Sequence, residues 1–205
     1  MENAINFYLE ANKLKDVIRT GWKEVGIPAD KIESVADHIY GTMTLVIGII
    51  SELKGYSDID FAKIYKMLFV KELVKAKTSE RSVLSKEEKK EVDRENIISM
   101  LEPLQIRDEL LSLYDEAVAE ETKDAKFVLY VSKLESDIQA KKYEMDGYFT
   151  LENALKDIEY YPEDIKKSIK PQVENASDGW ILFDRRYYEG NDDFVNLSNK
   201  VQGLK

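Results

Sequence analysis

The sequence contains no cysteine, and histidine occurs only once, as His38. Without cysteine the chain can form no disulfide, no thiolate metal site and no cysteine nucleophile. A single histidine excludes every metal site that is built from several histidines. The common catalytic motifs are also missing, since the chain has no G-x-x-x-x-G-K-[ST], G-x-G-x-x-G, G-x-S-x-G or H-E-x-x-H segment. On composition alone, a lone histidine is more often a core residue than a ligand.

Long apolar runs are lacking as well. The most apolar segment, residues 45–50, is far shorter than the roughly 20 residues that span a bilayer. The first four residues show neither the basic nor the apolar region of a signal peptide. The formal net charge of −10 opposes non-specific binding to nucleic acid or to anionic membranes. We therefore expect a cytoplasmic protein that binds neither nucleic acid nor membrane.

Alternation with a period of two, which is typical of strands, is nearly absent, whereas apolar residues recur at helical spacing. This pattern predicts an all-α protein, with a single helical domain over residues 1–146 and a C-terminal helical extension over 147–205 that packs on the same domain. Helices are expected at about 32–53, 60–77, 107–120 and 122–144, and from the Ser85–Glu88 capping box to near Pro103. In the extension, an aromatic stripe is expected to pack in the core: Trp180, Phe183, Tyr187 and Tyr188.

Several short motifs follow one another in the first forty residues. Leu14-Lys15 precedes R-T-G-W at residues 19–22, and E-S-V-A-D-H occupies residues 33–38. In this order and spacing the motifs resemble those of the HD-domain phosphohydrolases, in the 5′-deoxynucleotidase branch. The resemblance continues through A-K-F-V at residues 125–128 and covers roughly residues 12–143. It implies a helical fold, hydrolysis of nucleotides with a divalent metal ion and, in many members, a homodimer.

The resemblance also implies where the metal ligands should be. The family uses a histidine, a consecutive His-Asp pair on the next helix and an aspartate on a later helix, and a glutamate one turn after the pair completes the site. These positions correspond here to His38, Lys71-Glu72, Ser132 and, for the glutamate, Lys75. An ammonium group has no lone pair and repels a cation, and a neutral hydroxyl is a poor ligand. We therefore expect no metal cofactor and no catalytic residues of the family type.

A different use of the same positions is a basic pocket. In the family, the arginine and tryptophan of R-x-G-W contact the phosphate and sugar of the nucleotide, and Arg19 and Trp22 stand here at those positions. Lys71 and Lys75 are four residues apart and therefore share one helical face. The predicted ligand is a small anion, such as a nucleotide or another phosphate-bearing molecule. The predicted ligand-binding residues are Arg19, Trp22, His38, Lys71, Glu72, Lys75 and Ser132.

Three hypotheses for function remain open at this point. The first is a catalytically degenerate HD-domain protein that serves as a ligand-binding or interaction module. The second is a metal-dependent phosphohydrolase with an altered site, using His38 and Glu72 with another acid such as Glu135 or Asp137. The third is a structural homo-oligomer with a vestigial pocket, in which Lys71 only balances an acid such as Glu72. The replaced His-Asp pair favours a protein that is not an enzyme.

Overall fold

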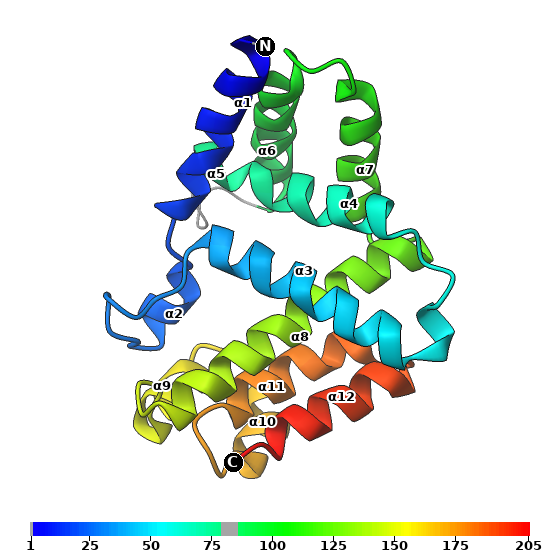
Figure 1. The fold of residues 1–205 in the computed structure, drawn as a ribbon. Helices are drawn as coiled ribbons and strands as arrows, with labels where there is room; N and C mark the ends of the chain where they lie inside the picture. Colours follow the sequence, from blue (N-terminus) through cyan, green and yellow to red (C-terminus); the bar gives the residue numbers. More distant parts are fainter. Residues whose placement is uncertain (1, 79–85) are drawn as a thin grey trace. The chain divides into compact units, whose positions relative to one another are not determined.

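The computed structural model describes residues 2–78 and 86–205, and within these ranges the chain is helical and has no strand (Figure 1). The nearest approach to a sheet is one isolated antiparallel bridge between Ile18 and Ser34. The predicted all-α fold is confirmed. None of the helices in these ranges has the length and apolar character required to cross a membrane. The capping box predicted at Ser85 lies outside the described residues.

The chain forms two compact units. The first comprises Met1–Thr20 and Glu33–Leu129, and the second comprises Gly21–Ile32 and Tyr130–Lys205. Helix α8 (Lys123–Met145) begins in the first unit and continues through the second. The boundary that we expect at residue 146 separates a domain from its C-terminal extension and is not a boundary between these two units. It stays a prediction.

The first unit contains the helices expected from the apolar spacing. The predicted helix at 60–77 is interrupted at Val74, whose φ and ψ are helical but which separates α4 from α5. The elements of this unit are α1 (Glu2–Asn12), η1 (Lys13–Lys15), α3 (Val35–Glu52), η2 (Lys54–Tyr56), α4 (Phe61–Leu73), α5 (Lys75–Thr78), α6 (Lys86–Leu101) and α7 (Arg107–Ala119). Helix α2 (Thr20–Glu24) begins at Thr20, the last residue of this unit's first segment, and its other residues belong to the second unit.

Side-chain caps determine where α3 and α4 begin. At the start of α3, the Ser34 hydroxyl accepts a hydrogen bond from the Asp37 backbone N–H, and the Asp37 carboxylate accepts one from the Ser34 backbone N–H. At the start of α4, Asp60 accepts from the backbone N–H groups of Ala62 and Lys63. Two residues of the E-S-V-A-D-H motif therefore fix the start of α3, which places His38 in its first turn.

The core of the first unit forms where α4 packs against α3 and α7. Apolar side chains recur along one side of each helix and are withdrawn from water, which is the main source of stability for such helices. Those that are buried in α3 and α4 are Val35, Ile39, Val46, Ile49, Ile64, Met67, Leu68, Val70 and Leu73. Lys71 and Glu72 thus lie between two buried residues of α4, Val70 and Leu73, which fix this part of the helix.

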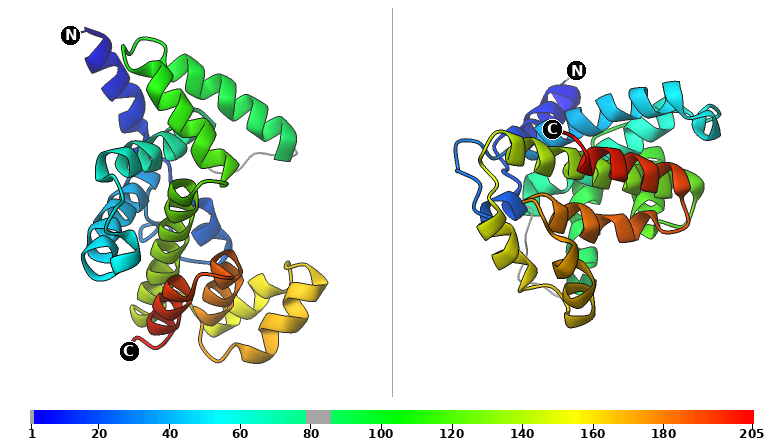
Figure 2. Two further views of the ribbon diagram at one scale, coloured as in Figure 1. Left: turned by 90° about the vertical axis from the view of Figure 1, so that its right-hand side faces the viewer. Right: turned by 90° about the horizontal axis from the view of Figure 1, so that it is seen from below.

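The second unit is built around aromatic side chains. The ring of Trp22 is fully buried, stacks on Trp180 at 4.2 Å between centroids and meets Tyr143 edge-on. Tyr188 is also fully buried, whereas Tyr187 is 39% exposed, so the predicted aromatic stripe packs in the core only in part. Helices α11 and α12 lie side by side (Figure 2). Besides α8, the elements are α9 (Leu151–Ile158), α10 (Glu163–Ile169), η3 (Lys170–Gln172), α11 (Asp178–Arg185), η4 (Arg186–Tyr188) and α12 (Asp192–Gln202).

Replacing two glycines by alanine should change the stability of the protein in opposite directions. Gly26 has φ +81°, and a Cβ added there would lie 2.5 Å from Nδ2 of Asn153, so we expect Gly26→Ala to lower the free energy of unfolding. The left-handed backbone alone accounts for about 1–2 kcal/mol of this loss. Gly48 lies inside α3 and has no atom within 4 Å of an added Cβ, so it provides the control. Gly48→Ala should raise stability by about 0.5–1 kcal/mol. Urea denaturation measures both, and equal effects of the two substitutions would contradict the assignment.

Candidate functional site

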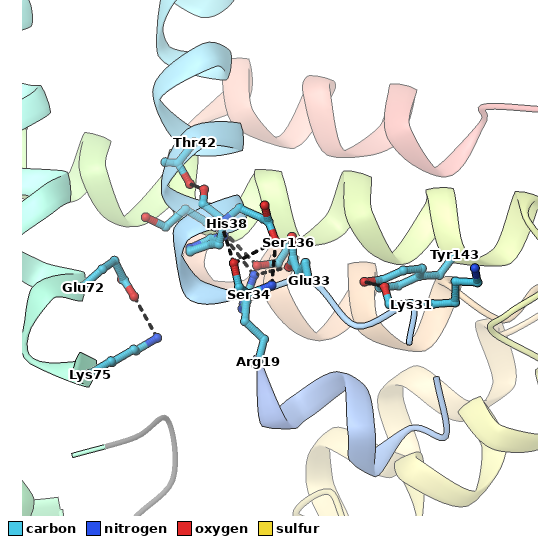
Figure 3. Close-up of polar contacts among 12 residues, drawn as sticks. Arg19, Lys31, Glu33, Ser34, His38, Thr42, Glu72, Lys75, Ser136 and Tyr143 are labelled. Atoms are coloured by element: carbon cyan, nitrogen blue, oxygen red, sulfur yellow. Dashed lines mark hydrogen bonds and ion pairs between the residues drawn. The ribbon is translucent and has the colours of Figure 1, made fainter. Parts of the chain in front are cut away.

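The site begins with a hydrogen-bonded group of three side chains from the first unit. Nη1 of Arg19 lies 2.8 Å from Oε1 of Glu33 and 2.9 Å from Nδ1 of His38 (Figure 3). The backbone holds these side chains in register, because the Arg19 N–H donates to the Glu33 carbonyl at 3.1 Å. A guanidinium group can only donate hydrogen bonds, so Nδ1 of His38 must be the acceptor. A neutral His38 therefore carries its proton on Nε2.

Burial and nearby positive charge keep His38 in its neutral form. The residue is 3% exposed, and the loss of solvation is the main cause that lowers its pKa well below the ordinary value of 6.5. The positive charges of Arg19, Lys75 and Lys71 lower the pKa further, whereas the negative charge of Glu72 acts in the opposite direction. Burial and the contact with the Arg19 guanidinium therefore both favour the neutral imidazole.

An ion pair between α4 and α5 forms the other part of this site. Nζ of Lys75 lies 2.7 Å from Oε2 of Glu72, and the side chains are 22% and 8% exposed, respectively. Burial by itself would raise the pKa of the Glu72 carboxyl, but attraction to Lys75 and Lys71 outweighs burial and holds the pKa below its ordinary range. Glu72 is therefore ionised at neutral pH, and its charge is balanced by an ammonium group.

The donor groups at the family's metal positions in the first unit do not fit a divalent cation. His38 offers one imidazole nitrogen to Arg19, and the Glu72 carboxylate is already paired with Lys75. Lys71, at the position where the resemblance leads us to expect an imidazole ligand, supplies a positive charge that repels a metal ion. A transition metal prefers several imidazole and carboxylate donors that face one open position. His38, Lys71 and Glu72 therefore do not by themselves form such a donor set.

Two predicted site residues belong to the second unit. Trp22 is enclosed by Tyr143 and Trp180 and serves the core of that unit. Ser132 is buried in α8, its carbonyl accepts a hydrogen bond from the Ser136 hydroxyl, and its own hydroxyl makes no hydrogen bond within the described part of the chain. The structure thus places Arg19 against His38 and Lys75 against Glu72 in the first unit. The ligand-binding roles of Arg19, Trp22, His38, Lys71, Glu72, Lys75 and Ser132 all stay predictions.

The residue that sequence reasoning missed is Glu33. It opens the E-S-V-A-D-H motif, and its carboxylate holds the Arg19 guanidinium with side chains that are 8% and 13% exposed. The motif marked the position but gave no reason for a carboxylate there. Of the alternative acids, Asp137 accepts a hydrogen bond from the Tyr188 hydroxyl at 3.0 Å inside the second unit, and burial raises the pKa of Asp137 well above its usual value. Glu135 is also buried.

Comparison with known proteins gives concordant results. The family model described as HD domain matches residues 11–172. The chain is 31% identical over 164 residues to 5′-deoxynucleotidase HDDC2 of Dictyostelium discoideum, covering 76% of this chain and 85% of that protein. It is 30% identical over 144 residues to the Mus musculus protein of the same name, covering 68% of this chain and 69% of that one.

Solved structures show the same fold. A conserved hypothetical protein from Pyrococcus furiosus superposes with a TM-score of 0.64 at 26% identity, covering 98% of this chain and 99% of that one. A predicted metal-dependent phosphohydrolase from Magnetospirillum magnetotacticum superposes with a TM-score of 0.62 over 96% of this chain and 93% of that one. Its identity to this chain is 17%, so it supports the fold alone.

The pKa of His38 can be tested without ambiguity, because it is the only histidine in the sequence. The unfolded chain takes up a proton near pH 6.5, whereas the folded chain does so only at a lower pH. Stability should therefore be highest above pH 6.5 and decrease as the pH falls from 6.5 toward the folded pKa. Denaturation curves of the wild type between pH 7 and 5 should show this decrease, and His38→Gln should show much less of it. An imidazole that titrates near 6.5 in NMR spectra of the folded protein would contradict the prediction.

Proposed function

Because the chain belongs to the HD-domain family, we propose that it uses the family's ligand site to bind a phosphate-bearing ligand without hydrolysing it. The observation that carries this proposal is that two cations lie at the expected site positions of the first unit, with Arg19 2.9 Å from Nδ1 of His38 and Lys75 2.7 Å from Glu72. Lys71 is next to Glu72 in α4 and adds a third positive charge. The ligand class comes from the relatives, which are named 5′-deoxynucleotidases. A nucleoside monophosphate is the proposed ligand.

The cations are paired with internal acids, and neither cation is completely withdrawn from water. Arg19 is paired with Glu33 and Lys75 with Glu72, and the side chains of the two cations are 13% and 22% exposed. A phosphate monoester carries up to two negative charges and several acceptor oxygens, so it can add to or replace such contacts. A charge-assisted hydrogen bond in a partly buried site contributes about 1.5–3 kcal/mol. Two or three of them are sufficient for a measurable affinity.

Binding without turnover follows from what the site lacks chemically. Hydrolysis of a phosphate ester in a metal-dependent hydrolase requires a water molecule that the metal ion has activated. An ammonium group at Lys71 or Lys75 can balance phosphate charge, but it does not generate a hydroxide ion. The neutral His38 accepts a hydrogen bond from Arg19 and is held in one tautomer. These groups support ligand binding and do not supply a nucleophile.

A second candidate is a metal-dependent phosphohydrolase with an altered site. The observation in its favour is the 31% identity to a protein named as a 5′-deoxynucleotidase. Such an enzyme would use His38 and Glu72 together with another acid such as Glu135. A third candidate is a structural homodimer or larger homo-oligomer in which the cations only balance Glu33 and Glu72. The two experiments below distinguish these candidates.

Ligand binding is tested by calorimetry with deoxynucleoside monophosphates, nucleoside monophosphates and sugar phosphates. We expect binding that weakens with added salt, because screening reduces the attraction between the cations and the phosphate. Lys71→Met should lower the affinity by about tenfold or more, which corresponds to about 1.4 kcal/mol.

Lys66→Met is the matched control for that experiment. Lys66 also lies in α4, and its ion pair with Glu109 is largely exposed, with side chains 41% and 49% exposed. An exposed pair of this kind contributes about 1 kcal/mol or less to stability. Affinity should be unchanged in this variant. No binding by the wild type at millimolar ligand would leave the vestigial pocket as the explanation.

Hydrolysis is tested by phosphate release from deoxynucleoside monophosphates in the presence of magnesium, manganese, cobalt, nickel or zinc. We expect release no faster than in the protein-free control, because the site has no group that activates water. Turnover that Glu72→Gln abolishes would establish the altered-site hydrolase instead. Turnover that persists in both Glu72→Gln and His38→Ala would identify a contaminating enzyme.

A further inference from the structure

Lys71 and Lys75, at the positions where the resemblance leads us to expect metal ligands, also bear on why the site would not hold a metal ion. The site could fail to hold a metal ion because donors are missing, or because a positive charge already occupies the place of the metal. We infer that the Lys75 ammonium group is an internal cation that occupies the place of the metal ion beside Glu72. A divalent ion is then excluded for two reasons: the ammonium group repels it, and Lys71 stands where an imidazole ligand would be needed. This inference holds whether or not the site binds phosphate.

The geometry of the ion pair is the first support. The ammonium of Lys75 lies 2.7 Å from the Glu72 carboxylate, and that carboxylate is 8% exposed. A buried carboxylate without a positive partner is strongly unfavourable, so some cation must stand beside it. Helix α4 ends at Leu73, and Lys75 is the first residue of α5, from where its side chain reaches back by three residues to Glu72.

The second support is that the remaining donors still share one site. His38 lies in the first turn of α3 and Glu72 in the last turn of α4, and both side chains are buried in the first unit. Figure 3 shows the Glu72–Lys75 pair facing the helix that carries His38. Helices α3 and α4 pack against each other, which keeps the two donors in fixed positions. The scaffold has therefore kept the place for a cation.

The consequence is that a divalent ion and the Lys75 ammonium compete for the same carboxylate. An ion bound to Glu72 would be held close to the Lys75 ammonium, and like charges at that distance in a buried site repel strongly. Removing the ammonium and supplying one imidazole should be enough to admit a metal ion. Two imidazoles and one carboxylate, with open positions, form a recognised site for divalent transition metals.

The experiment compares four full-length proteins: the wild type, Lys71→His, Lys75→Met and the double variant Lys71→His/Lys75→Met. Each is titrated with Co²⁺, because its visible absorption bands report coordination directly, and bound metal is counted by elemental analysis. We expect one Co²⁺ per chain in the double variant, with an affinity at least tenfold higher than that of Lys71→His alone. The wild type and Lys75→Met should show no coordination bands.

Three results would overturn the inference. Equal affinity of Lys71→His and the double variant would show that the ammonium of Lys75 does not exclude the metal. Stoichiometric Co²⁺ in the wild type, lost in His38→Ala, would show that the site accepts a metal ion as it is. A double variant that is folded, as judged by circular dichroism and thermal unfolding, but binds no Co²⁺ would show that His38 and Glu72 no longer share a site.

If the double variant does not fold, a stability measurement tests whether Glu72 requires the Lys75 ammonium group. Lys75→Met should lower the melting temperature because it leaves the Glu72 carboxylate buried without its cation, and Glu72→Gln/Lys75→Met should recover most of the loss. Failure of Lys75→Met to fold, with recovery in Glu72→Gln/Lys75→Met, has the same meaning. An unchanged melting temperature in Lys75→Met would overturn the role of Lys75 as a necessary internal cation.

Discussion

The requirement that a buried charge has a partner of opposite sign governs this structure. Glu72 and Glu33 are both carboxylates with side chains only 8% exposed, and each is held by a cation within 2.8 Å. In a low-dielectric environment an unpaired carboxylate is far more costly than a paired one. The positions of Arg19 and Lys75 follow from this constraint. His38 accepts a hydrogen bond from Arg19 and is kept neutral mainly by its burial.

The neutral state of His38 has a chemical meaning of its own. An imidazole that accepts from a guanidinium has a fixed tautomer, and the proton on Nε2 is then available as a hydrogen-bond donor. In a metal-binding relative the imidazole would instead offer a lone pair to a cation. In this chain the Nδ1 lone pair of His38 accepts a hydrogen bond from Arg19 instead.

The fold of this chain is shared with proteins of the HD-domain family. The family model matches residues 11–172, and the Pyrococcus furiosus structure superposes over 98% of the chain. The helices depend on apolar spacing and on caps such as Ser34 and Asp60, which are independent of any metal ion. A fold that is stable by packing can lose ligands without losing its shape, which is why fold similarity alone does not establish an activity.

The sequence by itself determined the helical class and most of the helix positions, and its motifs marked the family to which the chain belongs. These features depend on local spacing and on motifs of a few residues, which can be recognised along the chain. The tertiary structure alone decided that Lys75 is the partner of Glu72, that Glu33 holds Arg19, that the helix at 60–77 is divided at Val74, and that Trp22 serves an aromatic core with Trp180. Contacts of this kind join residues that are far apart in the sequence or select among several nearby cations, and they are fixed only when burial removes the competing partner, water.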